Sequence, residues 1–208
     1  EKVTNLLAQI QNLTEMLNGT KAGTVLFNET LVTAVGSIKV VALTAPDNPN
    51  ESASVSAPGA STHIKLPASV LGKAQDAETG IALLSVTSVA ANTTNAFDNL
   101  TSPSEDELGQ KQKTELQSEI IISVNLRDSD GESLNLDKLE EPIELIFDIA
   151  VNTSDSMRCA FWDEEELRWS SEGVITASSS HPDQVRCLTT HLSIFGVVRY
   201  VALLTDIG

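Results

Sequence analysis

The stretch CLTTHLSIFG (residues 187–196) holds a large share of the reactive side chains of this 208-residue chain. It contains one of the two cysteines, Cys187, and one of the three histidines, His191. The histidine is followed by a leucine and a serine, and then by an apolar run that is typical of a strand. A His-Leu-Ser tripeptide is short enough to arise by chance. The rest of the sequence must therefore decide whether this stretch is an ordinary strand or a reactive site.

On both sides of this stretch, short β-rich runs alternate with clusters of turn residues. Many short strands separated by turn signals predict a mainly β protein, an antiparallel β-sandwich. The expected strands are residues 24–32, 37–45, 62–67, 81–91, 118–127, 141–150, 158–163, 173–178 and 185–204, the last in one or two pieces. The clearest clusters of turn residues that would interrupt the strands are residues 45–61, 128–133 and 178–184. The polar segment 99–115 is expected to be a surface loop, with at most one helical turn.

The N-terminal segment has a different periodicity. Apolar residues recur through residues 2–18 at the spacing of an amphipathic helix, and Gly19 suits its end. We therefore expect a short helix over residues 1–20 and a β-sandwich over residues 21–208. The chain begins without Met or a signal-like apolar stretch, which is expected of a processed or excised piece.

The charge balance limits the classes of partner. The chain has 29 acidic and 13 basic residues, a net charge of −16. A protein this acidic lacks the basic patch that binds the phosphates of nucleic acid, so we expect no nucleic-acid partner. The same charge argues against docking on an anionic lipid surface. The simplest interpretation of the charge is that it keeps the protein soluble. The sequence also has no apolar run near the about 20 residues of a membrane helix.

Asn-X-Ser/Thr triplets indicate the compartment. The chain has 12 asparagines, and chance placement would give only about two such triplets. Seven are present, at Asn12, Asn18, Asn28, Asn50, Asn92, Asn99 and Asn152. This excess is typical of a glycosylated surface and predicts an extracellular protein of the secretory pathway, where two cysteines can pair stably.

The most informative block is residues 159–196. Both tryptophans of the chain, Trp162 and Trp169, follow shortly after Cys159, and the block ends with Cys187 and its neighbours. On its simplest interpretation the block is a disulfide-stapled hairpin with aromatic packing. Pairing the two cysteines would add about 3–4 kcal/mol of stability in the chain-entropy account of loop closure.

The order of residues in this block resembles a known family. It reads Cys-x-x-Trp from Cys159 to Trp162, Trp-Ser-x-x-Gly from Trp169 to Gly173, then Cys187 and His-Leu-Ser-x-Phe from His191 to Phe195. This frame, at residues 159–198, is similar to the GPCR-proteolysis site (GPS) that ends a GAIN domain. HIKLPASVL (63–71) and EPIELIFDIA (141–150) are weaker matches. The resemblance implies a membrane-proximal β-sandwich of the GAIN subdomain B type, with residues 1–20 as the remnant of a helical subdomain. It also implies that Cys159 pairs with Cys187.

The departures from the pattern favour one branch of the family. Adhesion G-protein-coupled receptors usually have two more cysteines, at places that hold Val174 and Thr189 here. Their joint absence is what the loss of one complete disulfide would produce. Thr190, before the histidine, replaces the asparagine common in adhesion receptors. These features are more similar to the polycystin-1-like and egg-jelly-receptor branch, with adhesion receptors as the alternative.

The resemblance implies cleavage of the bond between Leu192 and Ser193. The Ser193 hydroxyl would attack the Leu192 carbonyl in an N→O acyl shift, and water would then hydrolyse the ester. Histidine, with an ordinary pKa of about 6.5, suits the role of general base, which falls to His191. A tight turn between the last two strands would strain the peptide and assist the shift. Such a domain acts once on itself and is not a turnover enzyme.

Other chemistries have less support. No Gly-x-Ser-x-Gly elbow of a serine hydrolase occurs. The three histidines lack the spacing of zinc ligands, so His63 and His181 are interpreted as structural and no metal or cofactor is expected. The segment DSDGE (128–132) starts like a calcium loop but lacks the later ligands, and an Asp-Gly hairpin turn is the better interpretation.

The strand after the candidate bond, residues 193–208, is rich in apolar residues, which predicts burial with a partner strand on each side. Burying each such side chain is worth about 1.5–3 kcal/mol, so the strand should stay bound after cleavage as the domain's own partner. The resemblance implies further partners, namely the rest of a receptor or channel at the plasma membrane and an extracellular protein ligand. The rival interpretation is a glycosylated β-sandwich binding module that does not cleave.

Overall fold

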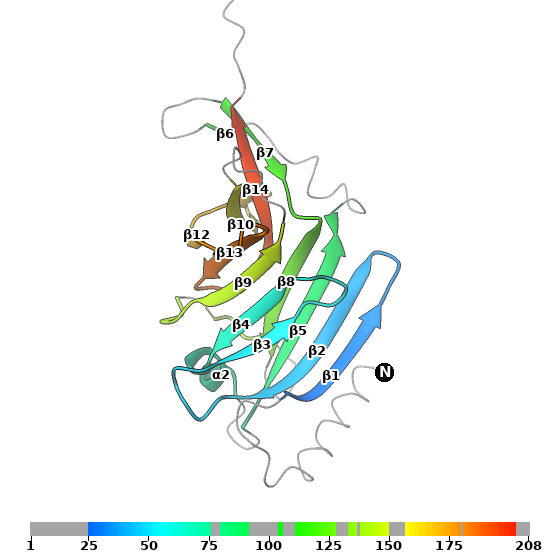
Figure 1. The fold of residues 1–208 in the computed structure, drawn as a ribbon, viewed down its shortest axis with the longest axis vertical. Helices are drawn as coiled ribbons and strands as arrows, with labels where there is room; N and C mark the ends of the chain where they lie inside the picture. Colours follow the sequence, from blue (N-terminus) through cyan, green and yellow to red (C-terminus); the bar gives the residue numbers. More distant parts are fainter. Residues whose placement is uncertain are drawn as a thin grey trace, which may run out of the picture.

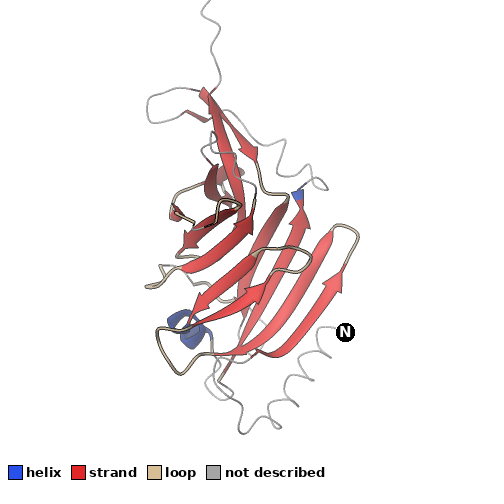
Figure 2. Cartoon of the chain, viewed as in Figure 1, coloured by secondary structure: helices blue, strands red, loops and turns tan. Residues whose placement is uncertain are grey.

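The computed structural model describes residues 25–75, 80–91, 104–105, 111–127, 133–136, 138–149, 157–179 and 181–202. This part of the chain is mainly strand, with one short α-helix, α2 (Ala68–Ala74) (Figures 1 and 2). The strands are β1 (Val25–Val32), β2 (Gly36–Thr44), β3 (Ser52–Ser56), β4 (His63–Pro67), β5 (Ile81–Ala90), β6 (Ser104–Glu105), β7 (Lys111–Leu116), β8 (Ile120–Arg127), β9 (Ile143–Asp148), β10 (Met157–Asp163), β11 (Arg168–Ser170), β12 (Val174–Ala177), β13 (Gln184–Thr189) and β14 (Ile194–Ala202). The helix expected over residues 1–20 lies outside the described residues.

The described strands form two antiparallel sheets that share one core. The larger, nine-stranded sheet has the order β1-β2-β5-β8-β14-β10-β11, with β7 also paired to β14 and β6 to β7. The smaller, five-stranded sheet has the order β12-β13-β9-β4-β3. The core includes Leu43, Leu84, Ile122 and Leu126 from the larger sheet and Ile64, Leu66, Leu145 and Phe147 from the smaller one. The predicted antiparallel β-sandwich is therefore confirmed.

Side chains that point alternately to the two faces of a strand explain why one face of the smaller sheet is buried and the other is not. In β9, Ile143, Leu145 and Phe147 are buried, whereas Glu144 and Asp148 between and after them point the other way. Successive side chains of a strand point to opposite faces, so one face of β9 lies in the core and the other carries charge.

Strand β8 has apolar residues at successive positions because both of its faces are covered. Ile122 lies in the main core between the sheets, whereas Ile121 lies in a second cluster with Trp162, Trp169 and Val198. The second cluster covers the outer face of the larger sheet around β8, β10 and β14. A strand buried on both faces is expected to lose the alternation of a half-exposed strand.

Strand β14 is an interior strand. Along one edge it pairs with β10 over Phe195 to Arg199, and along the other with β8 at Ile194 and Phe195 and with β7 from Val198 to Ala202. Between β7 and β8 the chain bulges, and the N–H groups of Gln117 and Ser118 both donate to the Val197 carbonyl, at 2.7 and 3.2 Å. Phe195, Gly196, Val197 and Val198 are buried. The predicted buried strand after Ser193 thus has neighbours on both sides.

Two expectations about local structure were wrong, and some elements were not expected. Strand β3 lies within the segment 45–61 that was assigned to a cluster of turn residues, and β6 and β7 lie in the supposed loop 99–115. Helix α2 follows β4 directly and was not expected; it buries Ala68, Val70, Leu71 and Ala74 on one face. The last predicted run forms two strands, and they belong to different sheets.

Among the described residues, no helix is long and apolar enough to cross a membrane.

Candidate functional site

Residues 190–193 form a short connector between the two sheets. They join the end of β13, in the smaller sheet, to the start of β14, in the larger sheet (Figure 1). The carbonyl of Thr190 accepts a hydrogen bond from the N–H of Leu139 at 2.9 Å, and that of Ser193 accepts one from Val124 at 3.1 Å. The backbone is thus anchored at both ends of the connector.

The candidate residues lie within this connector and are half-buried. Leu192 packs against the main core. The expected strain does not take the form of left-handed backbone. Among the described residues, the non-glycine positions with positive φ are Lys138 and Leu167, both outside the connector.

The ring of His191 is surrounded by groups from three other elements. It meets Phe161 of β10 edge-on, with ring centres 4.7 Å apart, and its centre lies 5.8 Å from that of Phe195 in β14. A Cβ placed on Gly173, in the turn before β12, would lie 3.8 Å from the ring atoms Nδ1 and Cε1. Gly173 has a φ of 71°, which glycine adopts without strain. These contacts fix the position of the imidazole.

A threonine two residues earlier also contacts His191. The Oγ1 of Thr189 lies 3.3 Å from Nδ1 of the imidazole, donates to the His191 carbonyl at 3.0 Å and accepts from the His191 N–H at 3.3 Å. Thr189 is the last residue of β13 and is 1% exposed. One buried hydroxyl therefore contacts both the backbone and the ring of the candidate base.

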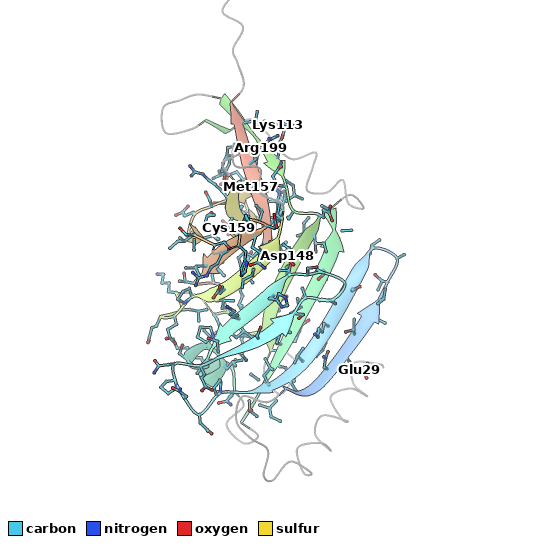
Figure 3. The ribbon with its side chains drawn as sticks, in the orientation of Figure 1. Glu29, Lys113, Asp148, Met157, Cys159 and Arg199 are labelled. Carbon is cyan, nitrogen blue, oxygen red and sulfur yellow. A yellow bond between two sulfur atoms is a disulfide. The ribbon has the colours of Figure 1, made fainter. Side chains whose placement is uncertain are left out.

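Cys159 and Cys187 form a disulfide with a Cα–Cα distance of 5.6 Å. Cys159 lies in β10 of the larger sheet, labelled in Figure 3, and Cys187 lies in β13 of the smaller sheet. Both are buried. The bond thus joins the two sheets, just before the chain reaches the connector, and the pairing implied by the GPS resemblance is confirmed.

The two tryptophans lie on the outer face of the larger sheet. Trp162 of β10 and Trp169 of β11 are opposite each other in the register, with their rings 5.5 Å apart in an edge-to-face arrangement. A Cβ on Gly196 of β14 would come within 3.0 Å of both Trp169 Cη2 and Leu116 Cδ1. Gly196 therefore allows the indole to pack closely on the strand that follows the candidate bond.

The two positions where adhesion receptors carry further cysteines face each other. Val174 of β12 and Thr189 of β13 are partners in the antiparallel register, and both are buried. Directly opposite residues have Cα atoms about 4.5–5.5 Å apart, which lies within the range that a disulfide spans.

The other histidines lie elsewhere in the fold. His63 is an exposed residue of β4, and its Nδ1 is 3.2 Å from the Ser56 hydroxyl. His181 is exposed in the turn before β13. Within the part of the chain that the structure describes, no three His, Cys, Asp or Glu side chains are grouped as metal ligands.

Each sheet carries one cluster of charged side chains. Arg199 of β14 donates to Glu115 of β7 at 2.7 Å, and this hydrogen bond, with help from Lys113, holds the pKa of Glu115 below its usual value. In the smaller sheet, burial raises the pKa of Glu144, but the hydrogen bond from Arg186 and the charge of Lys65 outweigh burial and lower it. Both carboxylates therefore favour the charged form in the folded state.

Two of the seven glycosylation triplets fall on described residues. Asn28 of β1 and Asn50, just before β3, are both exposed. The other five lie outside the described residues, as do residues 203–208 of the predicted post-cleavage strand.

Sequence reasoning missed two neighbours of His191. Phe161 stands two residues after Cys159, so a strand places both side chains on the same face, and this signal was available. The Thr189 contact also had a short-range signal, because a hydroxyl two residues away commonly bonds to the local backbone. Its approach to the imidazole depends on how the connector turns between the sheets.

The fold and these residues define a GAIN-type β-sandwich. A family model described as "GPS: GAIN subdomain B" matches residues 11–200. The chain therefore belongs to the GAIN subdomain B family, as its GPS-like residues predicted.

No curated protein matches the chain. Among solved structures it is similar to one described as the full extracellular region of zebrafish Gpr126/Adgrg6, at 16% sequence identity and a TM-score of 0.47. The similarity covers 79% of this chain and 23% of that one, so the matched part is a minority of that extracellular region.

Proposed function

We propose that this domain cleaves its own backbone once, between Leu192 and Ser193, and that the two fragments stay associated. The observation that carries the proposal is the placement of a histidine beside that bond. The ring of His191 is fixed by groups from β10, β14 and the turn before β12, in a connector whose two ends are anchored. A base that is already positioned loses little freedom on the way to the transition state.

The reaction needs no group from outside the chain except water. His191 takes the proton of the Ser193 hydroxyl while Oγ attacks the carbonyl carbon of Leu192 through a five-membered ring. The C–N bond then breaks and the nitrogen receives the proton, which leaves an ester and a new α-amine on Ser193. Water hydrolyses the ester, which gives the Leu192 carboxylate and restores the serine hydroxyl.

The position of β14 supports retention of the second fragment. Its backbone bonds to β10 on one edge and to β8 and β7 on the other do not involve the cleaved peptide bond. Phe195, Val197 and Val198 are each at most 1% exposed. Removing the strand would expose these side chains to water at about 1.5–3 kcal/mol each. The fragment that begins at Ser193 is thus the first partner of the rest of the domain.

The parent that fits best is a polycystin-1-like receptor or channel at the plasma membrane, with the domain on the extracellular side near the membrane. The buried disulfide suits an oxidising compartment, and exposed Asn28 and Asn50 suit glycosylation. Val174 lies opposite Thr189, so the two missing cysteines of the adhesion-receptor pattern correspond to one missing bond. An adhesion-receptor parent is the alternative, and an extracellular protein is the expected ligand.

Intact mass of the 208-residue chain after secretion and enzymatic deglycosylation tests the proposal. We expect wild-type protein to separate under denaturing conditions into residues 1–192 and residues 193–208. Native gel filtration should show one species that contains both. Ser193→Ala should remain intact, because it removes the nucleophile with little change in volume. A wild-type chain that stays intact would favour the rival function, a binding module that does not cleave.

Fragments from the Ser193→Ala protein would require a different nucleophile. Ser171, a serine in the turn after β11, provides a matched control, and Ser171→Ala should cleave as the wild-type chain does.

A further inference from the structure

We infer that Thr189 is a positioning residue that fixes the tautomer of His191, with the proton on Nδ1 and the lone pair on Nε2. The inference rests on the proposed self-cleavage, because it specifies which ring nitrogen acts as the base. It concerns the hydroxyl that contacts His191 at three places.

The number of available protons decides the tautomer. A threonine hydroxyl can donate one hydrogen bond and accept two. The carbonyl oxygen of His191 can only accept, so the 3.0 Å contact with it uses the single proton of the Thr189 hydroxyl. The hydroxyl must then accept from its two remaining neighbours, the His191 N–H and Nδ1, both at 3.3 Å.

Nδ1 can donate to this hydroxyl only if it carries a proton. In a neutral imidazole the other nitrogen, Nε2, then holds the lone pair. Nε2 is buried, so this lone pair lies inside the protein and is shielded from bulk water. The bond made by one ring nitrogen commonly determines the state of the other, and here a neutral hydroxyl supplies that bond.

The surroundings of Thr189 direct its hydroxyl to His191. The residue is 1% exposed, and its cross-strand partner is the apolar Val174. A buried hydroxyl without a bond costs free energy, so the protein contacts of the hydroxyl matter more here than they would at the surface. The hydroxyl meets this need through its contacts with the ring and backbone of His191. Thr189 therefore couples the end of β13 to the ring of the base.

Two substitutions at this position separate positioning from packing. Thr189→Val keeps the shape and removes the hydroxyl, whereas Thr189→Ser keeps the hydroxyl and removes a methyl group. Thr176→Val is a matched control, because the Thr176 hydroxyl bonds to the Cys159 N–H at 2.8 Å, on the neighbouring strand β12. Each variant is followed by pulse–chase expression in a secretory host, with the fraction cleaved measured on denaturing gels. Thermal unfolding is measured with Ser193→Ala added.

We expect Thr189→Val to slow cleavage by at least about tenfold, the factor that about 1.4 kcal/mol in the barrier produces. Thr189→Ser should cleave near the wild-type rate although it loses packing and unfolds at a lower temperature. Thr176→Val should also cleave near the wild-type rate. A purely structural role predicts the opposite order, with Thr189→Ser the slower variant. That order, or an unchanged rate in Thr189→Val, overturns the inference.

A spectroscopic measurement decides the case even if Thr189→Val fails to fold. In Ser193→Ala protein with ¹⁵N-labelled histidine, at about pH 8 where histidine is ordinarily neutral, we expect the proton of His191 on Nδ1. A proton on Nε2 overturns the inference. A wild-type chain that never cleaves would instead overturn the proposed function, and the tautomer measurement would still test the role of Thr189.

Discussion

The larger sheet is built differently on its two sides. On the connector side, which comprises β14, β10 and β11, the strands carry a disulfide and a tryptophan pair, and both faces of β14 are buried. On the hairpin side, which comprises β1 and β2, Leu31, Val32 and Val35 are 55%, 73% and 58% exposed. The connector side constrains its backbone from several directions, whereas the hairpin side has apolar side chains in contact with water. Constraint is concentrated where the proposed chemistry requires a fixed geometry.

Substituting one large side chain on each side tests this contrast most strongly. Phe195→Ala should destabilise the fold by about 3–5 kcal/mol, because a fully buried ring is lost and leaves a cavity. Leu31→Ala should change stability by no more than about 0.5 kcal/mol. Denaturant unfolding of both variants, with Ser193→Ala added, measures the difference. Phe195 also contacts His191, so we expect slower cleavage and weaker fragment retention in Phe195→Ala alone.

Equal effects of Phe195→Ala and Leu31→Ala would show that the connector side is no more constrained than the hairpin side. Wild-type cleavage and fragment retention in Phe195→Ala would show that the ring does not hold the strand.

Removal of the disulfide is the next largest perturbation. The bond closes a loop across a sequence separation of 28 residues. Replacing both cysteines by alanine should cost about 3–4 kcal/mol. The loss should also slow cleavage, because the sheets would no longer be linked beside the connector. Unfolding midpoints and the fraction cleaved provide the measurements, and the matched comparison is wild-type protein with and without a reducing agent. Alkylation of both sulfurs without prior reduction would contradict the pairing.

Replacing two glycines by alanine provides a smaller test, because the two variants should change the stability of the fold in opposite directions. Gly196→Ala should destabilise by about 1–3 kcal/mol, because its Cβ would press on the buried ring of Trp169. Gly72 lies in α2, away from the connector (Figure 1), and a Cβ added there would have no atom within 4 Å. Gly72→Ala should stabilise by about 0.5–1 kcal/mol, because alanine favours helix. Thermal unfolding of both variants measures whether each gains or loses stability. Destabilisation of both would contradict the expected difference between the two positions.

The smallest expected effect is a loss of folding stability at acidic pH. The pKa values of Glu115 and Glu144 are lowered in the folded protein from an ordinary value of 4.5. A carboxyl with a lowered pKa contributes stability above its unfolded pKa and loses it as the pH falls through its folded pKa. Stability should therefore decline below about pH 4.5, by no more than about 1 kcal/mol for each of these partly exposed pairs.

Glu144→Gln should reduce this decline, whereas Glu29→Gln, at an exposed carboxylate on β1 labelled in Figure 3, should leave it nearly unchanged. The measurement is the unfolding free energy between about pH 3 and 7, the range that spans ordinary carboxyl titration. Equal slopes for both variants would contradict the assignment of the effect to Glu144.

The sequence predicted strands best where side chains alternate between core and water. In β9 the buried positions 143, 145 and 147 are all apolar, and two of the three positions on the opposite face, Glu144 and Asp148, are charged. Strand β3 was missed because only Ala53 and Val55 mark its buried face, among serines that also occur in turns. Strand β7, KQKTEL, was missed because it is mainly polar, and its backbone pairing with β14 provides the order that its composition does not indicate.

The candidate site was predictable in its residues but not in its arrangement. The spacing of Cys159, Cys187 and the His-Leu-Ser tripeptide indicated the family. No local pattern shows that β13 and β14 belong to different sheets, because strand periodicity is the same in either sheet. The ring contacts of His191 follow from that crossing.

The pairing of β14 has a mechanical consequence. Its neighbours β10 and β7 run antiparallel to it, on opposite edges. A pull along the strand axis loads all of these backbone bonds together, whereas a pull across the strand would open them one after another. If the bond before Ser193 is cut, these backbone bonds and the buried side chains of β14 transmit tension along the strand to the sandwich. The lifetime of the attachment under load is then a rate set by an unbinding barrier, and the direction of the pull determines that rate.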